Sequence, residues 1–381
     1  MKLHDFQSTN EGEVLYHSHS SGPFVLHSMS LTSKTGNQIH AQDMLPFVDC
    51  PITVRKIKDC YVSNVNLIHT ESVIFANNGY HAETPNIDIS KFGITPDVKL
   101  KADNSKLVYP IKASEIKMGN GFYIGDTDNF GHWLFEFLPK ALWYKRLFPL
   151  EDIPIIVGGM VKKKWIDLMR ALSIDIKNVT RIKTGHTYKF DNLVVCSASI
   201  KRTKYGGALR SEDFMALRYF VEHHFKHISY TNTIDCLFCT RKNARWRKIE
   251  NEEEIINWLE KNFVTKIFEP ETLSIEEQLN LLGKTKLFFG NGGSTPFTMF
   301  QPKDSVFFEI RPPYGSGIVG RSWPDLFRFG YHRIVTELAD AKKSETKDYM
   351  EENLLINMKK FKEDVTLAAK LSGLFPGKTF L

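Results

Sequence analysis

Leu287-Phe-Phe-Gly290-Asn-Gly-Gly293-Ser-Thr-Pro296-Phe is the stretch that decides the fold. The pattern predicts an apolar strand that stops at a glycine loop and feeds a short helix, with Pro296 at an acceptable first-turn position. A strand, a glycine loop and a helix in this order can present backbone N–H groups and a helix dipole to an anion. The stretch therefore predicts an α/β domain with an anion site at a strand end.

A basic cluster lies upstream, where a second apolar run ends in Cys-Thr-Arg241-Lys-Asn-Ala-Arg245-Trp-Arg247. Guanidinium groups can bind an anion through two parallel hydrogen bonds. Taken alone, such a cluster is usually a solvated surface, and the glycine loop could equally be a tight turn that tolerates positive φ. Because an acidic helix start at Asn251-Glu-Glu-Glu254 follows the arginines, we interpret cluster and loop together as a diphosphate site.

Strand and helix patterns alternate from about residue 120 to 228, and again after residue 233. This alternation indicates parallel sheets covered by helices. We expect a strand-rich N-terminal part of an acceptor domain at 1–110, a Rossmann-like acceptor domain at 111–230, a Rossmann-like nucleotide-sugar domain at 231–335 and a tail at 336–381. The apolar positions of the tail share one helix face, which favours packing on the body over contact with a membrane surface.

The composition excludes several classes of protein. The chain has 381 residues, of which 42% are apolar and 25% charged, with a net charge of +6. This charge suits anionic substrates but is too small and too dispersed to indicate a nucleic-acid partner. Five cysteines, mostly in apolar runs, predict buried thiols rather than a disulfide framework. No apolar stretch approaches the ~18 residues that span a bilayer, and the N-terminus lacks a signal-peptide core.

A third pattern is Asp126-Thr-Asp128-Asn129-Phe-Gly-His132-Trp-Leu-Phe-Glu136. His132 and Glu136 are four residues apart, so they share one helix face. A carboxylate beside an imidazole can raise the basicity of the ring or act as a base itself. The second histidine of a zinc-protease helix is missing, so no metal is expected. A histidine near a helix start can also be a cap or a core residue. Three residues on, Pro139 is expected to kink or end the helix.

The three patterns, in this order, resemble glycosyltransferase family 61, which includes bacterial capsule and lipopolysaccharide enzymes. The first resembles the family's Asn-Tyr-Gly-His-Trp-Leu-x-Glu/Asp-x-Leu-Pro-Arg motif and runs from Asn129 to Lys140. The second, Thr240-Arg241 to Asn251-Glu252, resembles a Ser-Arg…Arg…Asn-Glu segment. The third, from Phe289 to Pro302 and then Phe307-Phe-Glu-Ile310, resembles the family's glycine loop and following strand. The family's loop histidine is Asn291 here.

The resemblance implies a GT-B architecture, with two Rossmann-like domains facing a cleft and a strand-rich N-terminal extension. It also implies inverting, metal-independent transfer without a cofactor, from a nucleoside-diphosphate sugar, expected to be UDP-linked, to a hydroxyl of a glycan or glycolipid in capsule or other surface polysaccharide synthesis. The transferred sugar would be a hexose or a pentose. The expected place is the cytoplasm, with peripheral contact to the inner membrane as a further expectation. The alternative is an inactive GT-B-like module that binds a phosphorylated glycan or a partner protein.

Roles for individual residues follow from these patterns. The candidate bases are His132, Glu136, Asp126 and Asp128, of which the first two are favoured. The expected substrate-binding residues are Asn129, Arg241, Arg245, Arg247, Asn291, Gly292, Gly293, Ser294, Thr295 and Glu309. Among these, the arginines and the loop amides would stabilise the leaving diphosphate in place of a metal ion, and Glu309 would hold the ribose hydroxyls.

Overall fold

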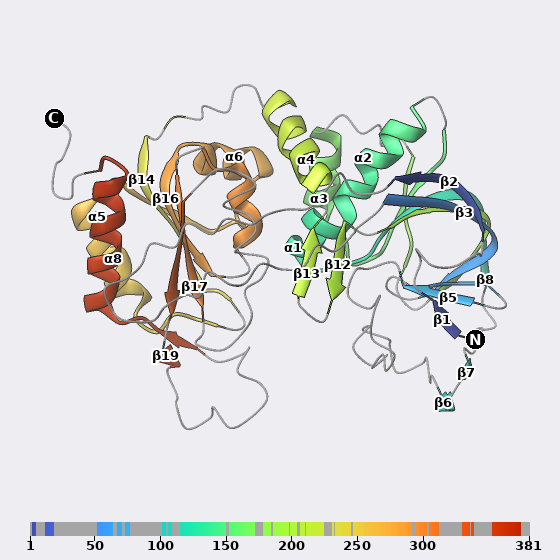
Figure 1. Cartoon of the computed structure of the whole chain (residues 1–381), viewed down its shortest axis with the longest axis horizontal. Coiled ribbons are helices and arrows are strands. Elements are labelled where there is room, and N and C mark those ends of the chain that lie inside the picture. The colour runs from blue at the N-terminus through green and yellow to red at the C-terminus, as the bar shows by residue number, and fades with distance from the viewer. Residues whose placement is uncertain are drawn as a thin grey trace. The chain divides into compact units, whose positions relative to one another are not determined.

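The computed structural model describes residues 2–4, 12–18, 52–63, 67–70, 73–76, 101–103, 106–108, 115–149, 152–171, 178–183, 186–197, 199–203, 206–209, 211–224, 231, 233–244, 247–291, 294–302, 305–311, 330–335, 337–338 and 353–374. The described residues up to Phe220 form one compact unit and those from Val221 onward form a second (Figure 1). No helix in the described part of the chain is long and apolar enough to cross a membrane.

The first unit is built on one sheet. The order of its described strands is β1-β5-β4-β3-β11-β8-β9-β10, and β2 pairs with the first half of β3. The bounds are β1 Lys2–His4, β2 Glu13–Ser18, β3 Ile52–Ser63, β4 Leu67–His69, β5 Val73–Ala76, β8 Glu115–Gly125, β9 Ile155–Val157, β10 Val179–Arg181 and β11 Thr187–Cys196. Two small hairpins accompany it: β6 Lys101–Asp103 with β7 Lys106–Val108, and β12 Ile200–Thr203 with β13 Gly206–Leu209.

This sheet is mixed. Its strands β8, β9, β10 and β11 pair in parallel, which confirms the interpretation of the strand–helix alternation. However, β3 pairs antiparallel with β11 along nearly its whole length. The strand–helix alternation between residues 120 and 228 did not predict this antiparallel neighbour. The reason is that the strand-rich N-terminal residues join the same sheet, and an antiparallel neighbour needs no crossover helix.

The helical run after β8 has three parts: α1 Phe130–His132, a π-helical turn η2 Trp133–Phe137, and α2 Leu138–Leu147. Pro139 lies in the first turn of α2 and does not end the helix. Proline offers no N–H to an α-helical partner, and the turn before it widens, since the N–H of Leu138 donates to the carbonyl of Trp133 five residues back. The expected kink or stop is thus replaced by a π-bulge, a feature that often marks functional sites.

Helix α2 is fixed to the unit at two points. The ring of Tyr144 packs edge-on against Phe122 of β8, with centroids 5.0 Å apart, and its hydroxyl donates to the carbonyl of Ile153. The indole N–H of Trp143 donates to Asp213 of α4 Ser211–His224, at 2.7 Å. The other helix of this unit, α3 Lys163–Ala171, follows β9. The turn before α2 therefore sits on a well-anchored helix.

The second unit has a parallel sheet in the order β15-β14-β16-β17-β18, as predicted. The bounds are β14 Ile234–Cys239, β15 Thr265–Phe268, β16 Thr285–Asn291, β17 Val306–Arg311 and β18 Gly330–Val335. In chain order this is 2-1-3-4-5, so the connections change direction between β14 and β16. In open parallel sheets, ligands bind outside the carboxyl ends of the strands at this switch point.

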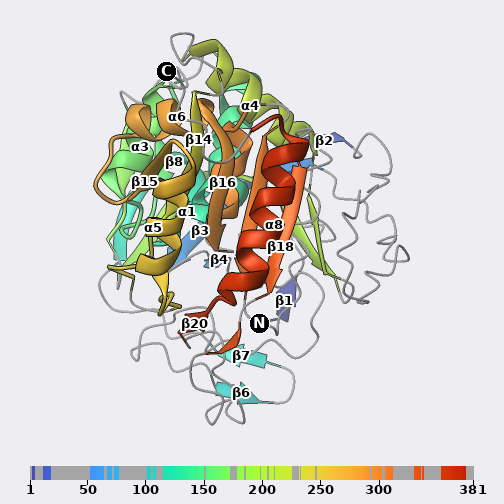
Figure 2. The same cartoon turned by 90° about the vertical axis from the view of Figure 1, so that its left-hand side faces the viewer.

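Both faces of this sheet are covered (Figures 1 and 2). Helices α5 Glu252–Asn262 and α8 Met358–Leu371 lie on one face. There Phe289 stacks on Phe308, with ring centroids 4.7 Å apart, and lies 5.7 Å from Phe361 of α8. Helix α6 Ile275–Gly283 and the 3₁₀-helix η3 Thr295–Phe300 lie on the other face, and β19 Glu337–Leu338 pairs with β20 Leu354–Leu355.

The predicted tail helix is α8. Its apolar face, which includes Phe361, Val365 and Ala368, is buried in the core of the second unit. Leu354 belongs to β20 rather than to the helix, and Leu371 is 65% exposed. Most of the apolar residues predicted to share one face of the tail helix therefore pack on the core of the second unit, as expected. The finer boundaries at residues 110, 230 and 335 stay predictions.

Candidate functional site

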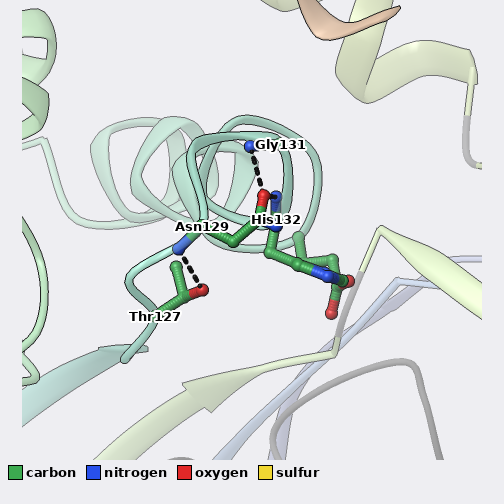
Figure 3. Close-up of polar contacts among 5 residues, drawn as sticks. Thr127, Asn129, Gly131 and His132 are labelled. Carbon is green, nitrogen blue, oxygen red and sulfur yellow. Dashed lines mark hydrogen bonds and ion pairs between the residues drawn. The ribbon is translucent and has the colours of Figure 1, made fainter. Parts of the chain in front are cut away.

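The His132–Glu136 pair lies in the first unit, directly after β8 (Figure 3). Asn129 caps the helical run, since its side-chain oxygen accepts from the N–H groups of Gly131 (2.8 Å) and His132 (3.3 Å). The N–H of Asn129 in turn donates to the hydroxyl of Thr127, at 3.1 Å. Asn129 is therefore placed as a capping residue, and its predicted contact with substrate stays a prediction.

The imidazole of His132 contacts the carboxylate of Glu136 at 2.5 Å, from Nδ1 to Oε1. The Glu136 side chain is 1% exposed and that of His132 32% exposed. A buried carboxylate thus holds a ring that still reaches the surface of the unit. Such a contact fixes which ring nitrogen carries the proton. This is neither of the alternatives raised for a single histidine, because His132 is not the cap and is not fully buried.

Asp126 is placed differently from the other candidate bases. Its side chain is buried, and Oδ1 accepts a hydrogen bond from the N–H of Met160, at 2.9 Å, in the turn between β9 and α3. Burial raises the pKa of its carboxyl from the ordinary 3.8 to about 6, against the effect of backbone hydrogen bonds from Met160 and Thr127. A Cβ at Gly158 would lie 1.9 Å from the Asp126 Cγ. The carboxyl therefore fits tightly against a glycine.

Asp128, two residues on, is exposed. It lies in the loop between β8 and α1, beside the cap formed by Asn129. Its predicted role as a base stays a prediction.

The second group of predicted residues lies at the switch point of the second unit. Thr240 and Arg241 follow β14, and Ser294 follows β16, so two neighbouring parallel strands bring these residues together. The hydroxyl of Ser294 lies 3.2 Å from the thiol of Cys239, the last residue of β14. The switch point is therefore where Arg241 and the loop after β16 meet, as the diphosphate interpretation requires.

The loop after β16 differs from the sequence pattern. Strand β16 runs through Gly290 to Asn291 instead of stopping at the glycine. Gly290 is needed there because a Cβ would lie 2.5 Å from the Cβ of Ser294, whose N–H donates to the carbonyl of Asn291 at 2.7 Å. The following helix η3 is a 3₁₀-helix of six residues. A dipole of that length is small, so the predicted contribution of a helix dipole is not supported.

Several predicted residues are buried or fall outside the described part. Asn291 is 1% exposed, and Glu309 is completely buried within β17, beside Gly290. The placement of Glu309 gives no support to contact with ribose hydroxyls, because its side chain is completely buried. Arg245, Gly292 and Gly293 lie outside the described residues, as does the side chain of Thr295.

Arg241 and Arg247 are both half-buried. Burial lowers the pKa of the Arg241 guanidinium, while Cys239, Glu271 and Glu252 raise it. Arg247 has a left-handed backbone, with φ of 57°. For a residue with a Cβ this conformation costs roughly 1–2 kcal/mol, and such strain is concentrated at functional sites.

Sequence reasoning missed Glu252. The N–H of Arg241 donates to its Oε2 at 2.8 Å, and the hydroxyl of Thr240 donates to its Oε1. The sequence placed it in an acidic helix start and at the end of the segment that resembles the family, without a role of its own, whereas its low exposure of 9% becomes visible only in the fold. Among the described residues, no three His, Cys, Asp or Glu side chains gather as a metal set. The four described cysteines are buried thiols, and Cys50 lies outside the described residues.

Comparison with known proteins finds one family that matches this part of the chain. Residues 130–307 match the family model described as Glycosyltransferase 61. The match begins at α1, next to His132, and ends within β17, so it includes both groups of residues. No curated protein matches the chain.

Proposed function

We propose that the chain, whose residues 130–307 match the model of glycosyltransferase family 61, is a glycosyltransferase that takes a sugar donor and a glycan acceptor. It inverts the anomeric carbon and uses His132 as its single base. The donor is a nucleoside-diphosphate sugar, UDP-linked, carrying a hexose or a pentose. The acceptor is a hydroxyl of a glycan or glycolipid in surface polysaccharide synthesis. The transfer takes place in the cytoplasm, at the inner membrane. The observation that supports the base most strongly is the contact of 2.5 Å between His132 and Glu136.

The His132–Glu136 contact supports a division of roles. With Nδ1 donating to the buried Glu136 carboxylate, the lone pair of the neutral ring is on Nε2, the atom that takes the acceptor proton. Glu136 orients the ring and stabilises the imidazolium that forms, as a carboxylate does for a catalytic histidine elsewhere. Asp126 is assigned a structural role, since its carboxylate accepts from Met160.

The acceptor oxygen forms a bond to the anomeric carbon while its proton passes to Nε2 of His132. The bond between that carbon and the diphosphate oxygen breaks, and the diphosphate leaves with the electron pair. Arg241 and Arg247, together with Arg245 and the backbone N–H groups of 292–295, stabilise the charge that develops on the leaving group. A metal ion is not required in this proposal.

A thermal-shift screen of the full chain tests the donor part of the proposal. UDP, GDP, CDP and ADP, with their sugars, are added in the presence of EDTA. A ligand at 100 times its dissociation constant stabilises the folded state by ~2.7 kcal/mol. We expect UDP and a UDP-sugar to raise Tm in EDTA. No shift with any of these compounds, or a shift only with a divalent cation, would contradict the diphosphate site. A donor that binds but is not turned over with any acceptor would favour the inactive binding module.

A further inference from the structure

The first residues of the loop that carries the arginines, Thr240 and Arg241, are held by Glu252. The N–H of Arg241 donates to Oε2 of Glu252 at 2.8 Å, and the hydroxyl of Thr240 donates to Oε1. The N–H of Thr240 also donates to the carbonyl of Phe268 in β15, at 3.2 Å. Both oxygens of one buried carboxylate thus accept from the first two residues of the loop. Since a carboxylate bound by two donors is held at a fixed distance from both, the backbone at Arg241 has little freedom.

The loop ends at a second anchor. The N–H of Glu250 donates to the carbonyl of Leu354 (2.9 Å), and the N–H of Leu354 donates to that of Lys248 (2.7 Å). The side chain of Asn251 bonds the backbone of Ile356 twice, accepting at 3.1 Å and donating at 2.8 Å. The segment before α8 therefore fixes residues 248–251, next to Arg247.

The strained backbone of Arg247 is consistent with a loop whose two ends are both held in place. A left-handed backbone at a non-glycine residue persists only where its surroundings determine it. Here the fixed Lys248–Glu250 backbone follows it directly. Asn251 and Glu252 are consecutive residues at the start of α5, so one helix start holds both ends of the loop.

We propose that Glu252 is a positioning residue for diphosphate recognition, whose carboxylate holds the backbone of Arg241 so that its guanidinium meets the phosphates. This inference rests on the proposed function. Glu252 itself does not contact the donor, because an anion would be repelled by its charge and both its oxygens already accept hydrogen bonds. It also lies close enough to Arg241 to offset part of the cost of burying that cation.

The test compares Glu252→Gln with Glu253→Gln in the full chain. Glutamine can still accept from the N–H of Arg241, but it removes the negative charge and puts an NH₂ group opposite the Thr240 hydroxyl, so both charge-assisted bonds to the carboxylate are lost. Glu253 is the next residue of the same helix turn and is exposed, so its variant removes the same charge from the helix start without touching the loop. Calorimetry measures binding of UDP and of uridine, and a thermal-shift assay measures binding of inorganic pyrophosphate.

For Glu252→Gln we expect binding of UDP to weaken by about tenfold, with weaker binding of pyrophosphate and unchanged binding of uridine. Glu253→Gln should bind all three as the wild type does. Equal weakening of UDP and uridine would show a merely structural role and overturn the inference. If Glu252→Gln binds UDP as the wild type does while Arg241→Ala loses UDP binding, the inference is overturned and the proposed diphosphate site stands.

Failure of the proposed function looks different. If the wild type binds UDP no better than uridine and does not bind pyrophosphate, the diphosphate site itself is wrong, and the inference falls with it. If Glu252→Gln does not fold, Thr240→Val removes the hydroxyl bond to Oε1, together with the bond that the hydroxyl accepts from the N–H of Lys242 at 3.2 Å. This variant should then show the same selective loss of UDP binding, and wild-type UDP binding in it would overturn the inference.

Discussion

Replacing Asp126 with asparagine should change how the stability of the first unit depends on pH. In the folded protein, burial raises the pKa of this carboxyl from 3.8 to about 6, a difference of about 2 pH units. The folded state therefore binds more protons than the unfolded state between pH 4 and 6, and stability falls as the pH rises through this range. At about 1.4 kcal/mol per unit, the loss from this one group is of order 3 kcal/mol, complete above pH 6.

The asparagine side chain of the Asp126→Asn variant cannot ionise, but its oxygen can still accept the hydrogen bond from Met160. The free energy of unfolding of Asp126→Asn, relative to the wild type, should thus increase by about 3 kcal/mol from pH 4 to pH 7. Urea unfolding at half-unit steps of pH, followed by tryptophan fluorescence, measures this difference. Asp167→Asn is the control, since it removes an exposed carboxylate of α3 in the same unit.

A difference that does not change with pH, or that falls as the pH rises, would refute the reasoning. The second result would mean that the fold stabilises the charged carboxylate. The pKa of Asp126 in the folded protein would then lie below the ordinary 3.8 instead of above it.

Two further substitutions test the packing of each unit. Gly158→Ala should destabilise the first unit by about 3 kcal/mol or more in urea unfolding, because its Cβ would lie 1.9 Å from the Cγ of the buried Asp126, whereas Gly119→Ala, with nothing within 4 Å, should have only a small effect. Phe361→Ala should lower the stability of the second unit by about 3–5 kcal/mol, while Leu367→Ala, 53% exposed, should change it little. If the two variants of either pair lowered the stability equally, the packing described for that unit would be contradicted.

Much of the second unit could be predicted from the sequence. Each strand from β14 to β17 is a short apolar run, and each helix between them has a clear apolar face. The period of the hydrophobic pattern and the length of each segment therefore indicate the same type of element. Parallel strands then place the residues after β14 and β16 at the same edge. The extension of β16 to Asn291 could not be predicted, because a glycine such as Gly290 ends a strand as often as it makes room for a neighbour.

The first unit was harder to predict for a physical reason. Strand β3 pairs with β11, more than a hundred residues away, and no local pattern encodes such a partner. A proline within an apolar helix pattern predicts a kink or a stop, and nothing in that pattern predicts that the turn before Pro139 widens into a π-helical turn.

Burial decided the roles of the carboxylates, and burial is a property of the fold. The spacing of His132 and Glu136 predicted that they share a helix face, and their contact at 2.5 Å agrees with it. Nothing in the sequence separates Asp126, which accepts from Met160, from the exposed Asp128. The same is true of Glu252, whose neighbours in the sequence are equally acidic.

The central claim is that His132, oriented by Glu136, removes the acceptor proton. The most direct test is the rate of acceptor-dependent nucleotide release by Glu136→Gln as a function of pH, with Asp167→Asn, an exposed carboxylate of α3, as the control. Loss of general-base catalysis typically costs about 10²–10⁴-fold. We predict that Glu136→Gln lowers kcat by about 10²-fold without changing the donor KM, and that the control has wild-type activity. A Glu136→Gln enzyme with the wild-type kcat and pH profile would contradict the claim.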